Sequence, residues 1–221
     1  MNNTLDLESV RLGELVNSYY LLGLSHHEEG QYRKSLRALK RADRRMNSVL
    51  LSVSRPASAA IYGIMGAIYM LLGEIDSALQ YCEKSLPTLL KIYGHTDHLD
   101  IAFSYHNMVG VYCSQGDYSK ALQYQEKSLN MRLNIYGHTD HPDIASSYNN
   151  MAVVYYSQGD YSKALQYYEK SLKMLLNIYG HTDHPDIASS YNNMALVYNS
   201  QGDYSKALQY YEKSLNMQLN I

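Results

Sequence analysis

A repeat of 43 residues runs through the sequence and restricts its fold more than any other feature. The stretch from Ile135 to Asn177 returns from Ile178 to Asn220 with only four substitutions. Glycines recur at the same spacing of 43 along the whole chain, at Gly30, Gly73, Gly116, Gly159 and Gly202. Self-similarity at such a period predicts a solenoid of about five repeats, in which each repeat buries its apolar face only against its neighbours.

Each repeat reads as a pair of helices. In the central copy, apolar residues follow helical spacing from Tyr148 to Tyr155 and again from Tyr161 to Leu176. Between them, Gly159 suits the left-handed residue that ends the first helix, because glycine has no Cβ to clash there. Asp160 follows as a predicted cap of the second helix. Ala164 is small where the two helices should cross, so their backbones can approach closely.

The connection to the next repeat carries its own signals. Gly180 is predicted to end the second helix, and Pro185 is tolerated in the first turn of the next. Asp183 and Asp186, three residues apart, resemble an acidic variant of the capping box. The sequence therefore predicts that Asp183 caps this helix.

The spacing of large and small residues resembles the tetratricopeptide repeat. The matching positions in the central copy are Tyr148, Met151, Ala152, Tyr155, Ala164, Tyr168 and Ser171. The segments HPDIASSYNNMAVVY and SQGDYSKAL are more specifically similar to the repeats of kinesin light chain. The resemblance implies an all-α fold, a right-handed α-solenoid of about five helix-turn-helix repeats. We expect a single domain over residues 1–221, with repeats at approximately 5–54, 55–91, 92–134, 135–177 and 178–221.

Composition and charge narrow the class of protein. A net charge of −2 argues against a nucleic-acid-binding or membrane-surface protein. Cys82 and Cys113 fall in different repeats with no metal-ligand pairing, which favours a reducing compartment, so we expect a cytoplasmic protein. Residues 56–73 form a run of eighteen without a charge, which touches the lower limit for a membrane helix. The repeat register favours the first helix of the second repeat instead.

The first repeat carries a concentration of positive charge. Its second helix holds Arg33, Lys34, Arg37, Lys40, Arg41, Arg44 and Arg45, against Asp43 alone, while the rest of the chain is net acidic. One interpretation is a docking surface for an acidic partner or for an acidic repeat of another copy. The other, which we favour from sequence, is an ordinary solvated helix face.

The motif GHTDH occurs three times and raises the question of a metal site. It supplies His95 and His98, His138 and His141, and His181 and His184. A pair of histidines three residues apart with an aspartate nearby can ligate zinc, but a third strong ligand is missing. We favour a loop and helix-cap role and predict no metal and no cofactor. No nucleophile-and-base arrangement or phosphate loop stands out, so we predict no catalytic residues and no enzyme.

The resemblance also implies a binding surface, because in this family the first helices line a concave groove that binds peptides. The matching candidates are Phe103, His106, Asn107, Asn149, Asn150, Tyr156, Asn192, Asn193 and Asn199. Side-chain amides present donors and an acceptor, so a ladder of Asn107, Asn150 and Asn193 can hold a peptide backbone irrespective of its sequence. Tyr156 is expected on the exposed face. The alternative is that the asparagines are simply solvated.

These observations predict a non-catalytic scaffold or adaptor, kinesin-light-chain-like, with a protein or peptide partner and neither nucleic acid nor membrane. The alternative is a sensor or oligomerisation arm of a larger multidomain signalling protein. Leu215 and Leu219 stand in the last repeat without a polar capping helix after them. We therefore expect a fragment of a longer protein.

Overall fold

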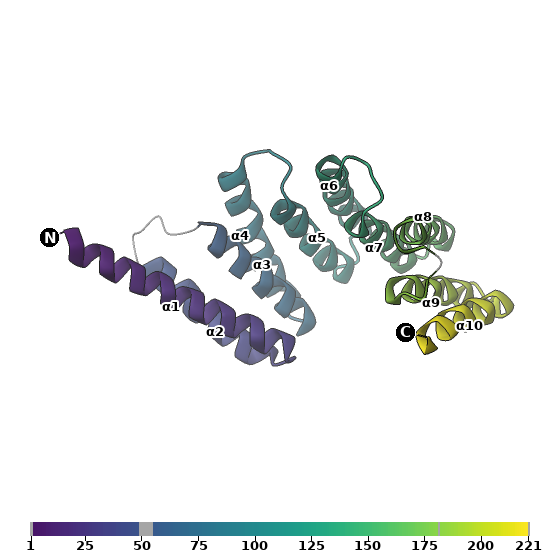
Figure 1. Ribbon diagram of the computed structural model, residues 1–221, viewed down its shortest axis with the longest axis horizontal. Helices are drawn as coiled ribbons and strands as arrows, with labels where there is room; N and C mark the ends of the chain where they lie inside the picture. The colour runs from purple at the N-terminus through teal and green to yellow at the C-terminus, as the bar shows by residue number, and fades with distance from the viewer. Residues whose placement is uncertain (1, 49–54, 181, 221) are drawn as a thin grey trace. The chain divides into compact units, whose positions relative to one another are not determined.

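The computed structural model describes residues 2–48, 55–180 and 182–220, and every regular element within these ranges is an α-helix (Figure 1). The helices are α1 (Asn2–Glu28), α2 (Tyr32–Ser48), α3 (Arg55–Leu71), α4 (Ile75–Tyr93), α5 (Leu99–Ser114), α6 (Tyr118–Tyr136), α7 (Pro142–Gln158), α8 (Tyr161–Tyr179), α9 (Pro185–Ser200) and α10 (Tyr204–Leu219). They fall into two compact units, Met1–Thr96 and Asp97–Ile221, and each is described by itself. The all-α prediction is confirmed, whereas the single domain over 1–221 stays a prediction.

The first unit consists of the hairpins α1/α2 and α3/α4, and α2 also packs against α3. The uncharged run of residues 56–73 lies almost wholly within α3, which packs along α4 as the repeat register predicts. The two helices come closest at Gly66, where an added Cβ would lie 2.7 Å from the Sγ atom of Cys82. Of the helices described, none combines the length and apolar character needed to cross a membrane.

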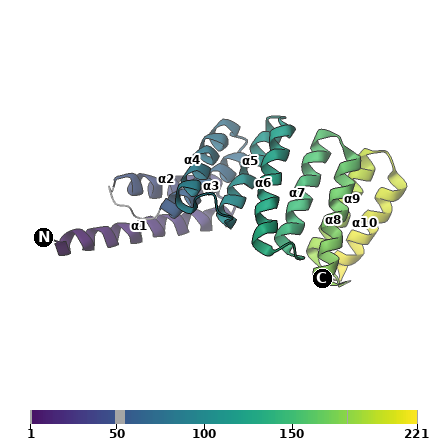
Figure 2. The same ribbon diagram turned by 90° about the horizontal axis from the view of Figure 1, so that it is seen from above.

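The second unit stacks the hairpins α5/α6, α7/α8 and α9/α10 in chain order (Figure 2). The second helix of one hairpin also packs against the first helix of the next, so that α6 contacts α7 and α8 contacts α9. The apolar face of each hairpin is therefore buried partly against its own partner helix and partly against the next repeat, as the solenoid prediction requires.

The turn inside each hairpin has the predicted chemistry. Gly159 adopts the left-handed conformation, with φ 85° and ψ 6°, and ends α7. Asp160 Oδ1 accepts a hydrogen bond of 3.1 Å from the backbone N–H of Lys163 and so caps α8. Ala164 is fully buried, where α8 packs on α7. The prediction for this turn is confirmed.

A serine on each second helix of this unit fastens it to the first. Buried Ser171 donates a hydrogen bond of 2.8 Å to the carbonyl oxygen of Ala145. The same bond recurs from Ser128 to Ala102 at 2.7 Å and from Ser214 to Ala188 at 2.8 Å. We call these three contacts the serine latches.

The cap of the first helix differs from the prediction. The capping residue of α9 is His184, whose Nδ1 accepts a hydrogen bond of 3.2 Å from the backbone N–H of Asp186. His98 and His141 cap α5 and α7 in the same way. The prediction that Asp183 caps this helix is therefore wrong, because α9 begins at Pro185 and leaves Asp183 one residue too early. His181 lies outside the described residues.

Tyrosines supply much of the packing between helices. Tyr168 is 3% exposed, and burial raises its pKa to about 12. Tyr155 is half-buried and its ring stacks on Tyr167 with 5.3 Å between centroids, while the Lys163 ammonium lies 5.1 Å from the Tyr155 centroid. The same arrangement recurs in the neighbouring repeats. The predicted packing role of these tyrosines is confirmed.

Candidate functional site

A hollow of about 340 Å³ lies between the first helices of two successive repeats, α7 and α9. We call it the α7/α9 hollow. It is lined by Pro142, Asp143, Ser146 and Asn149 of α7, by Asp186, Ser189, Ser190 and Asn193 of α9, and by Ser171 and Leu175 of α8. Apart from Pro142 and Leu175, every one of these side chains is polar, so the hollow offers hydrogen bonds more than apolar contact.

Helical periodicity explains why these side chains meet. On α7, Asp143, Ser146 and Asn149 follow one another at intervals of three residues and so share one helix face. Their counterparts on α9 occupy the same face because the two helices have nearly the same sequence and pack against neighbouring parts of α8. The α7/α9 hollow is thus a product of the repeat itself.

Two of the predicted asparagines meet in the hollow. Asn193 Nδ2 donates a hydrogen bond of 3.0 Å to Asn149 Oδ1. In the expected ladder, the neighbour of Asn193 is Asn150, so the observed partner lies one position away from it. The bond leaves the Asn149 amide nitrogen and the Asn193 amide oxygen to serve a ligand.

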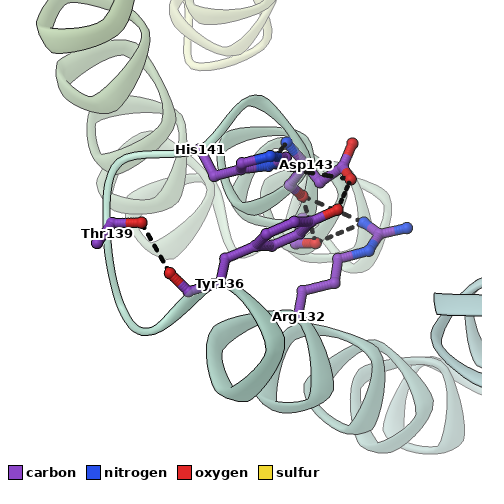
Figure 3. A network of polar contacts seen from close by, with 6 residues as sticks. Arg132, Tyr136, Thr139, His141 and Asp143 are labelled. Atoms are coloured by element: carbon purple, nitrogen blue, oxygen red, sulfur yellow. Dashed lines mark hydrogen bonds and ion pairs between the residues drawn. The ribbon is translucent and has the colours of Figure 1, made fainter. Parts of the chain in front are cut away.

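Asp143 is held in place at one side of the hollow by residues of α6 and the following loop (Figure 3). Its Oδ2 accepts a hydrogen bond of 2.5 Å from the Tyr136 hydroxyl, and this bond raises the pKa of Tyr136. The Tyr136 ring stacks on His141 with 3.5 Å between centroids, and Thr139 Oγ1 donates to the Tyr136 carbonyl at 2.7 Å. Asp186, by contrast, lies 3.8 Å from the Nδ1 atom of its own capping residue, His184.

Polar residues that the sequence analysis did not select join α6 to α7. Gln125 is fully buried, and its Nε2 donates to the Ser147 carbonyl at 3.0 Å. Arg132 Nη1 donates to Ser147 Oγ at 2.6 Å and to the Asp143 carbonyl at 3.2 Å (Figure 3). Tyr168 and Leu175 hold these positions in the next repeat. That exchange of apolar for polar residues at core positions was the signal in the sequence.

His106 belongs to the same junction. Its Nδ1 lies 3.3 Å from Gln125 Oε1, and because an amide oxygen only accepts, Nδ1 carries the proton. Burial lowers the pKa of His106, and the nearby Arg132 acts in the same direction. His106 is therefore neutral at pH 7 and serves as a packed hydrogen-bond donor.

The remaining predicted residues lie outside the lining of the α7/α9 hollow. Phe103 is 48% exposed on α5, and Asn199 is exposed near the end of α9. Three more asparagines are half-buried on their helices, Asn107, Asn150 and Asn192.

Tyr156 was expected on the exposed face, but it is half-buried. Its ring packs against the cluster that includes Ala152, with its centroid 5.7 Å from that of Tyr161. Its hydroxyl lies within hydrogen-bond distance, 2.9 Å, of Ser200 Oγ on α9. Tyr156 therefore helps to join α7 to α9. Within the described ranges, no three His, Cys, Asp or Glu side chains gather closely enough to hold a metal ion.

Comparison with protein families gives one consistent match. A model described as tetratricopeptide repeat matches residues 57–134, 100–177 and 143–220, and a second model of the same description matches residues 16–45. Together these matches cover most of the chain. Among proteins with curated descriptions, none matches this sequence.

Solved structures share the fold at low sequence identity. The crystal structure of BtubC (BKLC) from P. vanneervenii is 22% identical, covers 99% of this chain and 85% of that one, and gives a TM-score of 0.79. A putative kinesin light chain from Podospora anserina with nearly identical TPR-like repeats is 18% identical over 94% of this chain and 96% of that one, with a TM-score of 0.75.

A third structure is a much longer protein. The signal transduction ATPase with numerous domains and a tetratricopeptide repeat sensor, PH0952 from Pyrococcus horikoshii, is 22% identical with a TM-score of 0.74. The match covers 92% of this chain but 29% of that one. At these identities the likeness concerns the fold.

Proposed function

The chain belongs to the tetratricopeptide repeat family, and from that premise we propose that it is a non-catalytic scaffold that binds a segment of a partner protein at the α7/α9 hollow. The family's helical repeats bury their core within and between hairpins and leave the first helices to contact partners. The proposal assigns this role to the second unit, where three hairpins stack in order.

The observation that carries the proposal is the pair of amides, Asn149 and Asn193, at a polar hollow of about 340 Å³. An amide that donates and accepts can bind the N–H and C=O groups of an extended peptide whatever its side chains are. The carboxylates of Asp143 and Asp186 line the same hollow and favour N–H groups and cationic side chains. Such a surface suits a peptide more than a small apolar molecule.

Apolar residues on the same first helices add a place for the partner's side chains. Phe103, Val153 and Leu196 are 48%, 41% and 40% exposed on α5, α7 and α9. Large apolar side chains left open next to a polar hollow are typical of a surface that binds another protein. We propose that the partner's backbone lies at the amides while its apolar side chains contact these residues, as in a kinesin-light-chain-like adaptor.

A second candidate function is that of a sensor arm in a larger signalling protein. The likeness to the repeat sensor of the Pyrococcus horikoshii ATPase favours it, because there a repeat array of this size is part of a much longer chain. The two candidates use the same hollow and differ in what the bound segment controls.

Replacing the two amides tests the proposal. A peptide selected from a displayed random library on the wild-type chain is titrated calorimetrically against the N149A/N193A variant. Each lost, desolvated hydrogen bond should weaken binding by about 1–3 kcal/mol. The matched control is N130A/N216A, which removes two exposed asparagines of α6 and α10 outside the hollow. Equal affinity of the two variants, or failure of the chain to select any peptide, would refute the role of the hollow.

A further inference from the structure

The second helix of the first unit, α2, presents a row of cations on one face. Arg33, Arg37 and Lys40 stand four and then three residues apart, so they lie above one another on the helix. At a rise of 1.5 Å per residue, the row spans roughly 10 Å along the helix axis. Arg33 and Arg37 are exposed, and Lys40 is half-buried.

The row borders a hollow of about 360 Å³ between α2 and the end of α3, which we call the α2/α3 hollow. Besides the three cations, it is lined by Leu36, Tyr69, Leu72 and Glu74. Leu36 and Tyr69 are nearly buried and Leu72 is half-buried, so they form an apolar floor beneath a charged rim. The hollow therefore combines a place for an apolar group with a place for anions.

The cations of the rim are not neutralised by carboxylates. In the part of the chain that the structure describes, neither Arg33 nor Arg37 forms an ion pair, and the Arg37 Nε donates to the Arg33 carbonyl at 3.3 Å. The Lys40 ammonium lies 5.4 Å from the centroid of the Tyr69 ring. Glu74 is the one carboxylate among the lining residues. Three cations beside one anion leave an excess positive charge that an acidic ligand would compensate.

We propose that the α2/α3 hollow is a second docking site, which takes an acidic linear segment of a partner protein with one apolar side chain among its carboxylates. The two guanidinium groups bind carboxylates through paired N–H donors, and the apolar side chain packs on Leu36 and Leu72. A nucleic acid fits less well, because binding to its phosphates needs a broad basic surface, whereas here the cations are confined to one helix of a chain with net charge −2.

This site is separate from the α7/α9 hollow and is tested without it. The probe is a fluorescein-labelled twelve-residue peptide of glutamates around a central leucine, and its binding to the full chain is followed by fluorescence anisotropy. The R33Q/R37Q variant should bind it about tenfold more weakly, and added NaCl should weaken binding to the wild type. The charge-matched control, K34Q/R41Q, removes two cations of α2 that do not line the hollow and should stay within about twofold.

The remaining arms separate this site from its rivals. Replacing the peptide's leucine by serine should weaken binding, and N149A/N193A should leave it unchanged. Equal weakening by R33Q/R37Q and K34Q/R41Q would show a diffuse field in place of a site and overturn the proposal. Binding of a single-stranded DNA oligonucleotide as tight as that of the peptide, or absence of peptide binding, would overturn it as well. Circular dichroism of each variant confirms that the helices remain, since all four substituted side chains are exposed.

Discussion

Removing the serine latches should destabilise the second unit by an amount that the structure allows us to calculate. Each of Ser128, Ser171 and Ser214 is buried and donates one hydrogen bond of 2.7–2.8 Å to a carbonyl of the partner helix. Such a bond contributes about 1 kcal/mol net. Alanine also favours a helix by about 0.5 kcal/mol over serine, which offsets part of the loss at every site.

A matched substitution removes that offset from the comparison. Ser119, Ser162 and Ser205 lie on the same three helices, and all are exposed. The triple S119A/S162A/S205A changes the helix propensity in the same direction without breaking a latch. We therefore expect S128A/S171A/S214A to be less stable than this control by about 1 kcal/mol per latch, or about 3 kcal/mol in all, because latches in separate repeats should act additively.

Urea unfolding of the full chain, followed by circular dichroism, measures this difference as a shift in midpoint. The slope of the free energy against urea should stay the same, since the folded and unfolded surfaces hardly change. The single variants give the contribution of each latch. A difference below about 1 kcal/mol between the two triple variants would refute the reasoning, because it would mean that water replaces the serine hydroxyl without loss.

Three further predictions concern other contacts. Because burial lowers the pKa of His106 from 6.5, the stability it allows is present above that value and lost as the pH falls below it; the free energy of unfolding should drop between pH 7.5 and 5.5, and H106N should reduce the drop, whereas an unchanged drop would contradict the assignment. A164L should lower the urea midpoint by overpacking a fully buried site, at a cost of about 1–3 kcal/mol, and a variant as stable as the wild type would show that α7 and α8 are not in close contact there. H141A should lose the cap of α7, about 1 kcal/mol in thermal unfolding, while H141N keeps an acceptor and should lose less; equal losses would assign the effect to stacking on Tyr136 alone.

The helical hairpins follow from the sequence because the repeat constrains them several times over. Gly159 and Asp160 recur with every copy, and a glycine followed by a capping aspartate specifies the same turn wherever it appears. The packing of Tyr168 was predictable for the same reason. Local chemistry and the apolar period agree at these positions, so little is left for tertiary contacts to decide.

The helix caps were less predictable because two candidates compete within three residues. Aspartate is the stronger capping residue in general, which made Asp183 the better choice from sequence. In the structure, the His184 ring stacks on Tyr179 with 3.6 Å between centroids, and this contact accompanies a helix start at Pro185. The deciding contact joins two residues across the loop, and no local propensity contains it.

The candidate site was predictable in part. Asn149 and Asn193 were selected from the family pattern and do line the α7/α9 hollow. Which asparagines meet depends on how far α9 is shifted along α7, and a repeat alignment assumes no shift. Tyr156 was misplaced for a related reason, because its exposure depends on the contact with Ser200 of the next repeat.

The junction between α6 and α7 explains how residues outside the hollow can set its geometry. At the α8/α9 junction the corresponding positions hold Tyr168 and Leu175, and apolar contacts such as these tolerate small sliding of one helix along another. Gln125 and Arg132 instead make directional hydrogen bonds to Ser147, and Arg132 also binds the carbonyl of Asp143 in the first turn of α7. Those bonds fix the position of α7 along α6, and with it the place of Asp143 in the α7/α9 hollow. The departures from the repeat in α6 therefore control a surface that they do not line.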